Sequence, residues 1–218
     1  MTSIAQPGIL ALWNDCREGA EAEYEAWYRG EHLRERVGLP GFRFGRRFQS
    51  LDGGSPRYFT YYETASPDVL TSPVYLERGA NPTPMTRHIM ENVFRNMSRT
   101  VCRRAATEGW INGPFAITVR ANAGDLARLE DGWDQLASLP DRLRAELWLS
   151  AEKPDDEPSV EERIRGRDAK IAGCLMMNFS DATHAAAAVT SIRGILGADV
   201  TIGIYRLFCA LDHQDITP

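Results

Sequence analysis

The sequence lacks any long hydrophobic run and any excess of basic residues. No stretch approaches the roughly 20 apolar residues that a membrane-spanning helix needs, and the first 16 residues contain no basic segment, so they predict a strand and not a signal peptide. With 25 Lys and Arg against 30 Asp and Glu, the net charge is -5, which argues against a general nucleic-acid-binding protein. We therefore expect a cytoplasmic protein with neither a nucleic-acid nor a membrane partner.

Cysteine and histidine are scarce, with four of each. The cysteines form no C-x-x-C pair, which removes the usual zinc and thioredoxin-like motifs, and each falls in an expected strand, where a free thiol is most often a small buried hydrophobic group. They lie far apart, at Cys16, Cys102, Cys174 and Cys209. P-loop, dinucleotide, G-x-S-x-G and H-x-x-E-H patterns are also absent. We therefore expect neither a metal ion nor an organic cofactor.

The composition is that of a globular protein large enough to enclose a pocket. Of the 218 residues, 43% are hydrophobic and 25% are charged. A chain of this length buries roughly 70% of its extended surface, as one large domain or as two domains of about 100 residues.

Periodicity predicts the element order strand, helix, strand, strand, helix, strand twice. In the first half we expect strands at 8–16, 42–49, 57–64 and 100–107, and helices at 20–37, 66–78 and 85–99. In the second half we expect strands at 113–122, 141–151, 169–179 and 199–211, helices at 125–139 and 181–196, and a charged loop at 153–168. We interpret this order as a tandem duplication with halves 1–110 and 111–218.

This element order predicts an α+β fold. Each half is a βαββαβ unit of the ferredoxin-like kind. A four-stranded sheet with helices on one face leaves its other face bare, and two such sheets in one chain can bury these faces against each other. The expected architecture is two halves packed sheet to sheet as a barrel, with the helices outside.

The first expected helix carries two ionisable residues on an aromatic stripe. At about 100° per residue, five side chains share a stripe about 140° wide with Glu31 at its centre, namely Tyr24, Trp27, Tyr28, Glu31 and His32. The opposite side is small and aliphatic, so the helix can pack one face on the sheet and turn the other toward a cavity. Burial there would favour protonated Glu31, and the Glu31 carboxylate would favour the imidazolium of His32. Alternatively, the pair only anchors neighbouring arginines or backbone groups.

The run from residue 22 to 48 resembles the dimeric α+β barrel superfamily, in particular EthD-like proteins, whose first helix often reads W-Y-x-x-E-H and precedes P-G-F. The matching residues are Trp27, Tyr28, Glu31, His32, Pro40, Gly41 and Phe42. The resemblance implies a pocket between sheet and helices with the first four of these residues in its wall. It also implies a range of chemistries: cofactor-free oxygenation of phenols, lactone isomerisation, polyketide cyclisation, dehydration, decarboxylation and, in other branches, haem chemistry.

Three further side chains are candidates for substrate binding. Arg46 is expected on the strand face that carries Phe42, Phe44 and Phe48, either as a pocket charge or as a side chain that reaches the surface. His88 and Arg99 belong to a polar stripe on the helix expected at 85–99, which either holds an anionic substrate or is a solvated face. The second half has Trp133 but no Glu-His pair after it, so we expect one site per chain.

The leading hypothesis is a cofactor-independent enzyme that moves a proton on a small hydroxylated aromatic or carbonyl compound, as a lyase, an isomerase or cyclase, or an oxygenase. His32 is then the general acid or base, Glu31 orients it, and Trp27 and Tyr28 stack on the substrate. Arg46 or a group of the 88–99 stripe holds an anionic oxygen.

Two other classes of protein stay open. One is a non-catalytic small-molecule binding protein that uses the same pocket. The other is a haem protein with His88 or His184 as the axial ligand. A homodimer of the internally paired chain is compatible with all three hypotheses.

Overall fold

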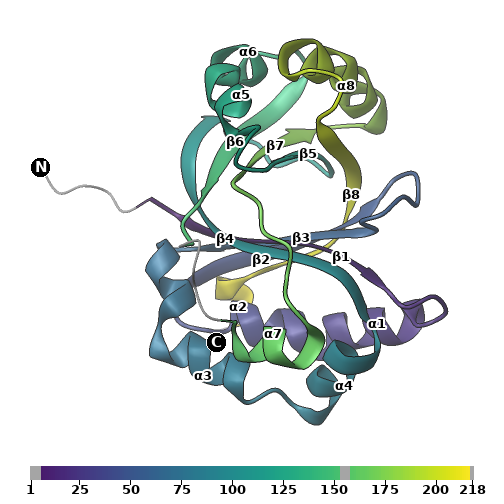
Figure 1. Cartoon of the computed structure of the whole chain (residues 1–218), viewed down its shortest axis with the longest axis vertical. Coiled ribbons are helices and arrows are strands. Elements are labelled where there is room, and N and C mark those ends of the chain that lie inside the picture. The colour runs from purple at the N-terminus through teal and green to yellow at the C-terminus, as the bar shows by residue number, and fades with distance from the viewer. Residues whose placement is uncertain (1–5, 153–157, 217–218) are drawn as a thin grey trace, which may run out of the picture.

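A computed structural model describes residues 6–152 and 158–216 and shows a closed β-barrel with helices on two opposite sides (Figure 1). The first half contains β1 (Gly8–Cys16), α1 (Glu21–Trp27), the π-helical segment η1 (Tyr28–His32), α2 (Leu33–Val37), β2 (Phe42–Ser50), β3 (Tyr58–Thr64), the 3-10 segment η2 (Pro67–Thr71), α3 (Pro73–Ala80), α4 (Pro84–Asn92) and β4 (Phe94–Gly109). The second half contains β5 (Phe115–Ala121), α5 (Leu126–Asp131), α6 (Trp133–Ala137), β6 (Arg142–Ser150), α7 (Val160–Arg165), β7 (Gly173–Phe179), α8 (Ala182–Leu196), β8 (Thr201–Asp212) and η3 (His213–Asp215).

Eight antiparallel strands close the barrel in the order β1-β3-β2-β8-β5-β7-β6-β4. The strand order within the first half is β4-β1-β3-β2, and the corresponding strands of the second half follow as β8-β5-β7-β6. The halves are joined by hydrogen bonds at two seams, β2 with β8 and β4 with β6. The sheets therefore do more than pack face to face, because each seam pairs strand edges that would otherwise be exposed. The expected α+β class, with the helices outside a barrel, is confirmed.

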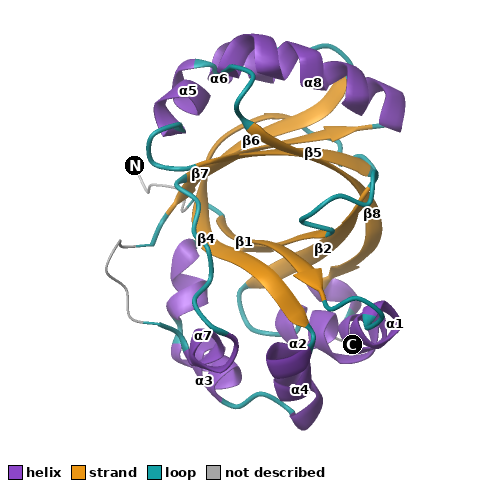
Figure 2. Ribbon diagram, turned by 45° about the vertical axis from the view of Figure 1, so that its right-hand side comes forward, coloured by secondary structure: helices purple, strands orange, loops and turns teal. Residues whose placement is uncertain are grey.

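Both faces of most strands are covered, because side chains fill the barrel interior and helices cover two sides of its outside (Figure 2). Every residue of β3 and β7 is buried, which explains why these strands have little polar alternation. The barrel interior is rich in large rings, among them Trp13, Phe59, Tyr61, Trp148 and Tyr205. Two further cores lie outside the barrel, one under each helical layer.

Helix α7 belongs to the second half in sequence but lies in the helical layer of the first half. Its residues contact α3 and α4, and Figure 1 shows it beside the helices α2, α3 and α4. The connection between β6 and β7 therefore crosses from one side of the molecule to the other. A wall of the pocket described below is built from this connection.

Three expectations about local structure are wrong. The helix expected at 85–99 ends at Asn92, because the following residues pair with β1 as the start of β4. Phe42 does not share a face with Phe44 and Phe48, because the register of β2 shifts after Phe42 and turns that ring outward under the helices. The segment expected as a loop at 153–168 contains α7, and its residues 153–157 lie outside the described structure.

Among the described residues, no helix is long and apolar enough to cross a membrane.

Candidate functional site

The aromatic face of the first helix packs on the barrel. Trp27 and Tyr28 are 2% and 3% exposed. On the small aliphatic side Ala22 is exposed but Leu33 and Val37 are buried, so both sides of the helix contribute to the core and the aromatic side does not face a cavity as expected. The aromatic rings surround Arg47 of β2, which is fully buried, lies 3.9 Å from the Tyr28 ring centre and pairs with Glu25 at 2.8 Å. Much of the aromatic stripe thus serves to bury a cation of the sheet.

Glu31 ties the first helix to α4. Its carboxylate accepts a hydrogen bond from Thr86 Oγ1 at 2.7 Å and another from the Thr83 hydroxyl. The Thr86 hydroxyl in turn accepts from the Trp27 indole N–H at 3.0 Å. Glu31 therefore bonds to α4, and none of the hydrogen bonds found among the described residues joins it to His32.

His32 is buried at the end of the π-helical segment. Its ring stacks on Trp27 with 4.3 Å between centroids, the residue is 8% exposed, and its Nδ1 has no hydrogen-bond partner among the described residues. Burial, reinforced by the positive charge of Arg36, holds the pKa of His32 well below its ordinary value of 6.5. The imidazole is therefore neutral at pH 7. π-helical turns are rare and often occur at functional sites.

A pocket of about 700 Å³ lies on the other side of Arg36. We call it the α3–α7 pocket, because η2 and α3 form one wall and α7 with the segment 166–172 that follows it forms another, while β4 lies between them. Its apolar lining includes Leu70, Val101 and Ile171. The volume is within the range of about 300–1,000 Å³ that is usual for small-molecule sites.

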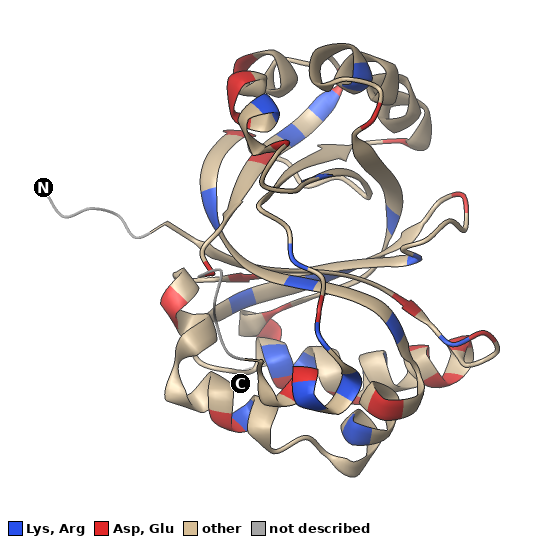
Figure 3. Ribbon diagram, in the orientation of Figure 1, with Lys and Arg blue, Asp and Glu red and all other residues tan. Residues whose placement is uncertain are grey.

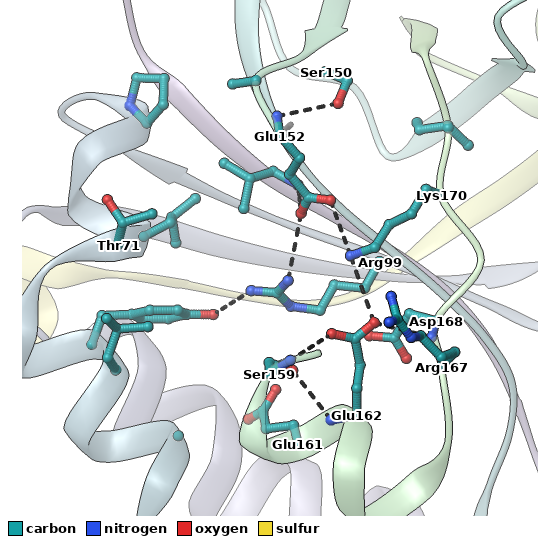
Figure 4. Close-up of a pocket in the computed structure, with 18 of the residues that line it drawn as sticks. Thr71, Arg99, Ser150, Glu152, Ser159, Glu161, Glu162, Arg167, Asp168 and Lys170 are labelled. Atoms are coloured by element: carbon teal, nitrogen blue, oxygen red, sulfur yellow. Dashed lines mark hydrogen bonds and ion pairs between the residues drawn. The ribbon is translucent and has the colours of Figure 1, made fainter. Parts of the chain in front are cut away.

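A line of alternating charge crosses this pocket. Arg99 of β4, 8% exposed, donates to the Tyr75 hydroxyl at 3.0 Å and lies 3.7 Å from the Glu152 carboxylate. Figure 4 shows the Arg99 guanidinium pointing toward the Glu152 carboxylate. Glu152 also pairs with Lys170 at 3.0 Å. Burial opposes the charge of Arg99, but the oxygens of Tyr75, Glu161 and Glu152 outweigh it and raise the pKa of Arg99.

A second charged cluster holds α7 against the first half, in the region where Figure 3 shows mixed charge on α7 and the neighbouring helices. Glu161 of α7 pairs with Arg36 of α2 and, at 3.4 Å, with Arg165. Burial favours the protonated form of Glu161, but Arg36, Arg165 and Arg99 outweigh it and lower its pKa to about 2. Arg165 also binds Asp168 at 2.7 Å, and burial raises the pKa of that carboxyl despite this partner.

The seven residues predicted to form one site lie at different places in the structure. Of the seven predicted site residues, only Arg99 lines the α3–α7 pocket. Arg46 faces the barrel interior, where its guanidinium lies 4.6 Å from the Phe44 ring centre. His88 lies on the surface of α4, with its side chain 46% exposed and paired with Glu23 at 2.8 Å. The remaining four lie in the first-helix region described above.

Sequence reasoning missed the other polar residues of the pocket. Tyr75, Glu152 and Lys170 come from three separate segments, and no spacing in the chain relates them. One signal was available, since Ser159-x-x-Glu162 is a capping box that marks the start of α7. Both reciprocal hydrogen bonds of that box are present.

No protein-family model matches the chain, and no curated protein sequence matches it. Solved structures do match. One is an anthrone oxidase-like protein, with 11% identity and a TM-score of 0.58 over 99% of this chain and 96% of that chain. A second, from Fusobacterium nucleatum subsp. nucleatum, is provisionally assigned as a monooxygenase, with 9% identity and a TM-score of 0.52 over 95% of each chain. A third, provisionally assigned as a chlorite dismutase, has 12% identity and a TM-score of 0.53 over 97% of each chain.

At identities this low, these likenesses concern the fold alone. They extend over almost the whole chain, so the closed barrel and both helical layers are compared together.

Proposed function

We propose that the protein is an enzyme that binds a small hydroxylated aromatic or carbonyl compound in the α3–α7 pocket and moves a proton on it without an organic cofactor. The observation that carries this proposal is the Arg99–Tyr75 pair, a buried guanidinium that donates to a phenol oxygen at 3.0 Å in the pocket wall. A fixed cation and a hydroxyl at one place are suited to stabilise an oxyanion that develops during a reaction.

The pocket residues divide into binding and proton-transfer roles. Arg99 and the Tyr75 O–H hold the carbonyl oxygen of the compound, and Glu152 removes a proton from the carbon next to the carbonyl carbon. The electron pair of the broken C–H bond moves onto the oxygen and forms an enolate, and return of the proton to another carbon completes an isomerisation. Lys170 at 3.0 Å and the Val101 N–H at 2.8 Å fix the position of the Glu152 carboxylate. Lyase and oxygenase reactions on such compounds can begin with the same proton removal.

For the first helix we propose a positioning role. His32 lies one helical turn before Arg36, and its imidazole interacts electrostatically with Arg36 and Glu161, which border the pocket. Glu31 fixes the same helix to α4 through Thr86. A direct catalytic role for His32 stays a prediction, which turnover by a His32→Gln variant would test.

A non-catalytic binding protein is the second candidate. It is favoured by the way the charged groups of the pocket already pair with one another, Glu161 with Arg36 and Glu152 with Lys170. Such pairing leaves a ligand to be held mainly by the apolar wall and by the Tyr75 hydroxyl.

The residues present do not fit the haem hypothesis. It requires a His in the wall of a pocket, and none of the described residues that line the α3–α7 pocket is a His. His88 and His184 lie on helix surfaces with side chains 46% and 44% exposed, and each pairs with a carboxylate.

We also propose that the chain arose by tandem duplication, with ferredoxin-like halves at 1–110 and 111–218 and an EthD-like first helix. The support is the strand order, β4-β1-β3-β2 in one half and the corresponding β8-β5-β7-β6 in the other. Helices α5 and α6 contain Trp133 but no Glu-His pair after it, consistent with one site per chain.

Deuterium exchange tests the proposed chemistry without knowledge of the product. Enolisable ketones, including ones that carry a hydroxylated aromatic ring, are incubated with the protein in D₂O, and loss of the signal of the C–H next to the carbonyl is followed by proton NMR. We expect Glu152→Gln to abolish exchange with little change in ligand affinity. We expect Arg99→Gln to weaken binding by about 10- to 100-fold, since a hydrogen bond to a charged group contributes about 1.5–3 kcal/mol.

His88→Gln on the surface of α4 is the control and should change neither quantity. If Arg99→Gln fails to fold, Arg99→Lys replaces it in the binding measurement, because lysine keeps the buried positive charge. Ligands that bind the wild type and never exchange would favour the binding protein. Exchange that survives Glu152→Gln would remove the proton-transfer assignment.

A further inference from the structure

Arg46 takes no part in the α3–α7 pocket and lies instead at one end of the barrel interior. There it comes close to Arg144 of β6 and to Asn112, which lies on the link between β4 and β5. Burial raises the pKa of the nearby Tyr61, and the positive charges of both arginines act to lower it. The three polar residues Arg46, Arg144 and Asn112 thus come from separate segments and meet at one place.

Hydrogen-bond acceptors are too few at this place. With its amide oxygen turned toward Arg46, Asn112 accepts from Nη1 and Nη2 at 3.1 and 3.2 Å. Turned the other way, the same oxygen accepts from Arg144 Nη1 at 3.5 Å. One amide cannot serve both guanidiniums, because its NH₂ group then faces the other. The Nε atoms of Arg46 and Arg144 are also buried and unpartnered among the described residues.

The neighbouring carboxylates supply an acceptor to Arg144 but none to Arg46. Glu146 pairs with Arg144 and Arg104 and accepts from the Trp148 indole at 2.6 Å. Glu63 pairs with Arg43 and Arg104. Two carboxylates therefore pair with three arginines, and in the described part of the chain Arg46 has no carboxylate partner.

Exposed apolar surface adjoins this excess of positive charge. Gly109 pairs with Arg144 across β4 and β6, and the next two residues, Trp110 and Ile111, are 92% and 61% exposed. Asn112 follows them directly. An indole that is almost wholly exposed offers a flat surface on which a planar ring can stack.

We propose that Arg46, Arg144 and Asn112 form a second binding site, separate from the α3–α7 pocket, for an organic carboxylate that bears an aromatic ring. The carboxylate accepts from the guanidiniums that compete for Asn112, and the ring lies against Trp110 and Ile111. This chemistry supplies both the acceptor and the apolar cover that the end of the barrel lacks.

The indole N–H signal of Trp110 reports on this site directly. It is identified in a proton–nitrogen NMR spectrum as the signal that Trp110→Phe removes, and the wild type is titrated with benzoate. We expect a saturable shift, with benzyl alcohol and inorganic phosphate each binding at least about tenfold more weakly, because one lacks the charge and the other lacks the ring. Arg46→Gln and Arg144→Gln should each weaken benzoate binding by about 10- to 100-fold.

Two control variants test whether the benzoate titration depends on surface charge in general or on the α3–α7 pocket. Arg193→Gln removes one exposed positive charge of α8, and Arg99→Gln alters the α3–α7 pocket; neither should change the Trp110 titration. A shift that does not saturate would overturn the proposal, as would benzyl alcohol binding as tightly as benzoate. If the Arg46 and Arg144 variants do not fold, the comparison of the three probes on the wild type decides the question.

Discussion

Glu161 is predicted to hold α7 on the first half, and Glu161→Gln tests this. The side chain is 12% exposed, and its pKa of about 2 in the folded protein compares with an ordinary value of 4.5. A difference of this size corresponds to roughly 3 kcal/mol at pH 7, at about 1.4 kcal/mol per pKa unit. Removing the charge also leaves Arg36 buried without its carboxylate, which acts in the same direction.

The sign of the pH dependence follows from the direction of this shift. Because the pKa of Glu161 is lower in the folded protein, the stabilisation is fully present above about pH 4.5 and is lost as the pH falls through about 2. The difference in unfolding free energy between wild type and Glu161→Gln should therefore shrink from roughly 3 kcal/mol at pH 7 to roughly 1.5 kcal/mol at pH 3.

Urea unfolding at the two pH values measures the global effect, and hydrogen exchange of the α7 amides measures local release of the helix. Glu35→Gln is the matched control, since the Glu35–Arg78 pair has side chains 25% and 22% exposed. It should cost no more than about 1 kcal/mol. The reasoning is refuted if Glu161→Gln costs no more than this control in either measurement, or if its cost is the same at pH 7 and pH 3.

Two further predictions concern the same region. Burial and the charge of Arg36 lower the pKa of His32 in the folded protein, so folding favours the neutral form and stability is lost as the pH falls below about 6.5. His32→Gln should therefore lose less stability than the wild type between pH 7 and pH 5, as measured by urea unfolding. An equally steep loss of stability in the variant would contradict the assignment. The Ser159 hydroxyl accepts a hydrogen bond from the Glu162 N–H at 3.1 Å, so Ser159→Ala should destabilise α7 by about 0.5–2 kcal/mol. We expect faster hydrogen exchange of the α7 amides with little change in global stability. Unchanged exchange would show that α7 does not need this cap.

The fold could be predicted further than the site. Strand and helix positions follow from local periodicity, and the barrel followed from the need to cover the bare face of each sheet. The end of the helix at Asn92 could not be read in the same way. Met85, Ile89, Val93 and Met97 keep a helical spacing, and it is pairing with β1, distant in the chain, that makes the later residues a strand.

The candidate site depends on contacts that local patterns do not reveal. The aromatic stripe was recognised, but its orientation is set by Arg47, a buried cation on β2 that the rings enclose. Arg99 was selected as a member of a helical stripe, yet it reaches the pocket because strand alternation places it beside Val101, with both in the pocket lining. Arg99 is therefore a pocket residue because of its place on a strand, and not because of the helical stripe from which it was predicted.

The position of the α3–α7 pocket has a structural cause in the unequal connections of the two halves. In the first half, β2 and β3 are joined by the short segment 51–57, whereas in the second half β6 and β7 are joined by residues 151–172. Only the longer connection crosses to the other helical layer, where Glu152, Glu161 and Lys170 complete a pocket whose other walls include Tyr75 and Arg99. The α3–α7 pocket is therefore built from both halves, and any chemistry it performs depends on the whole chain.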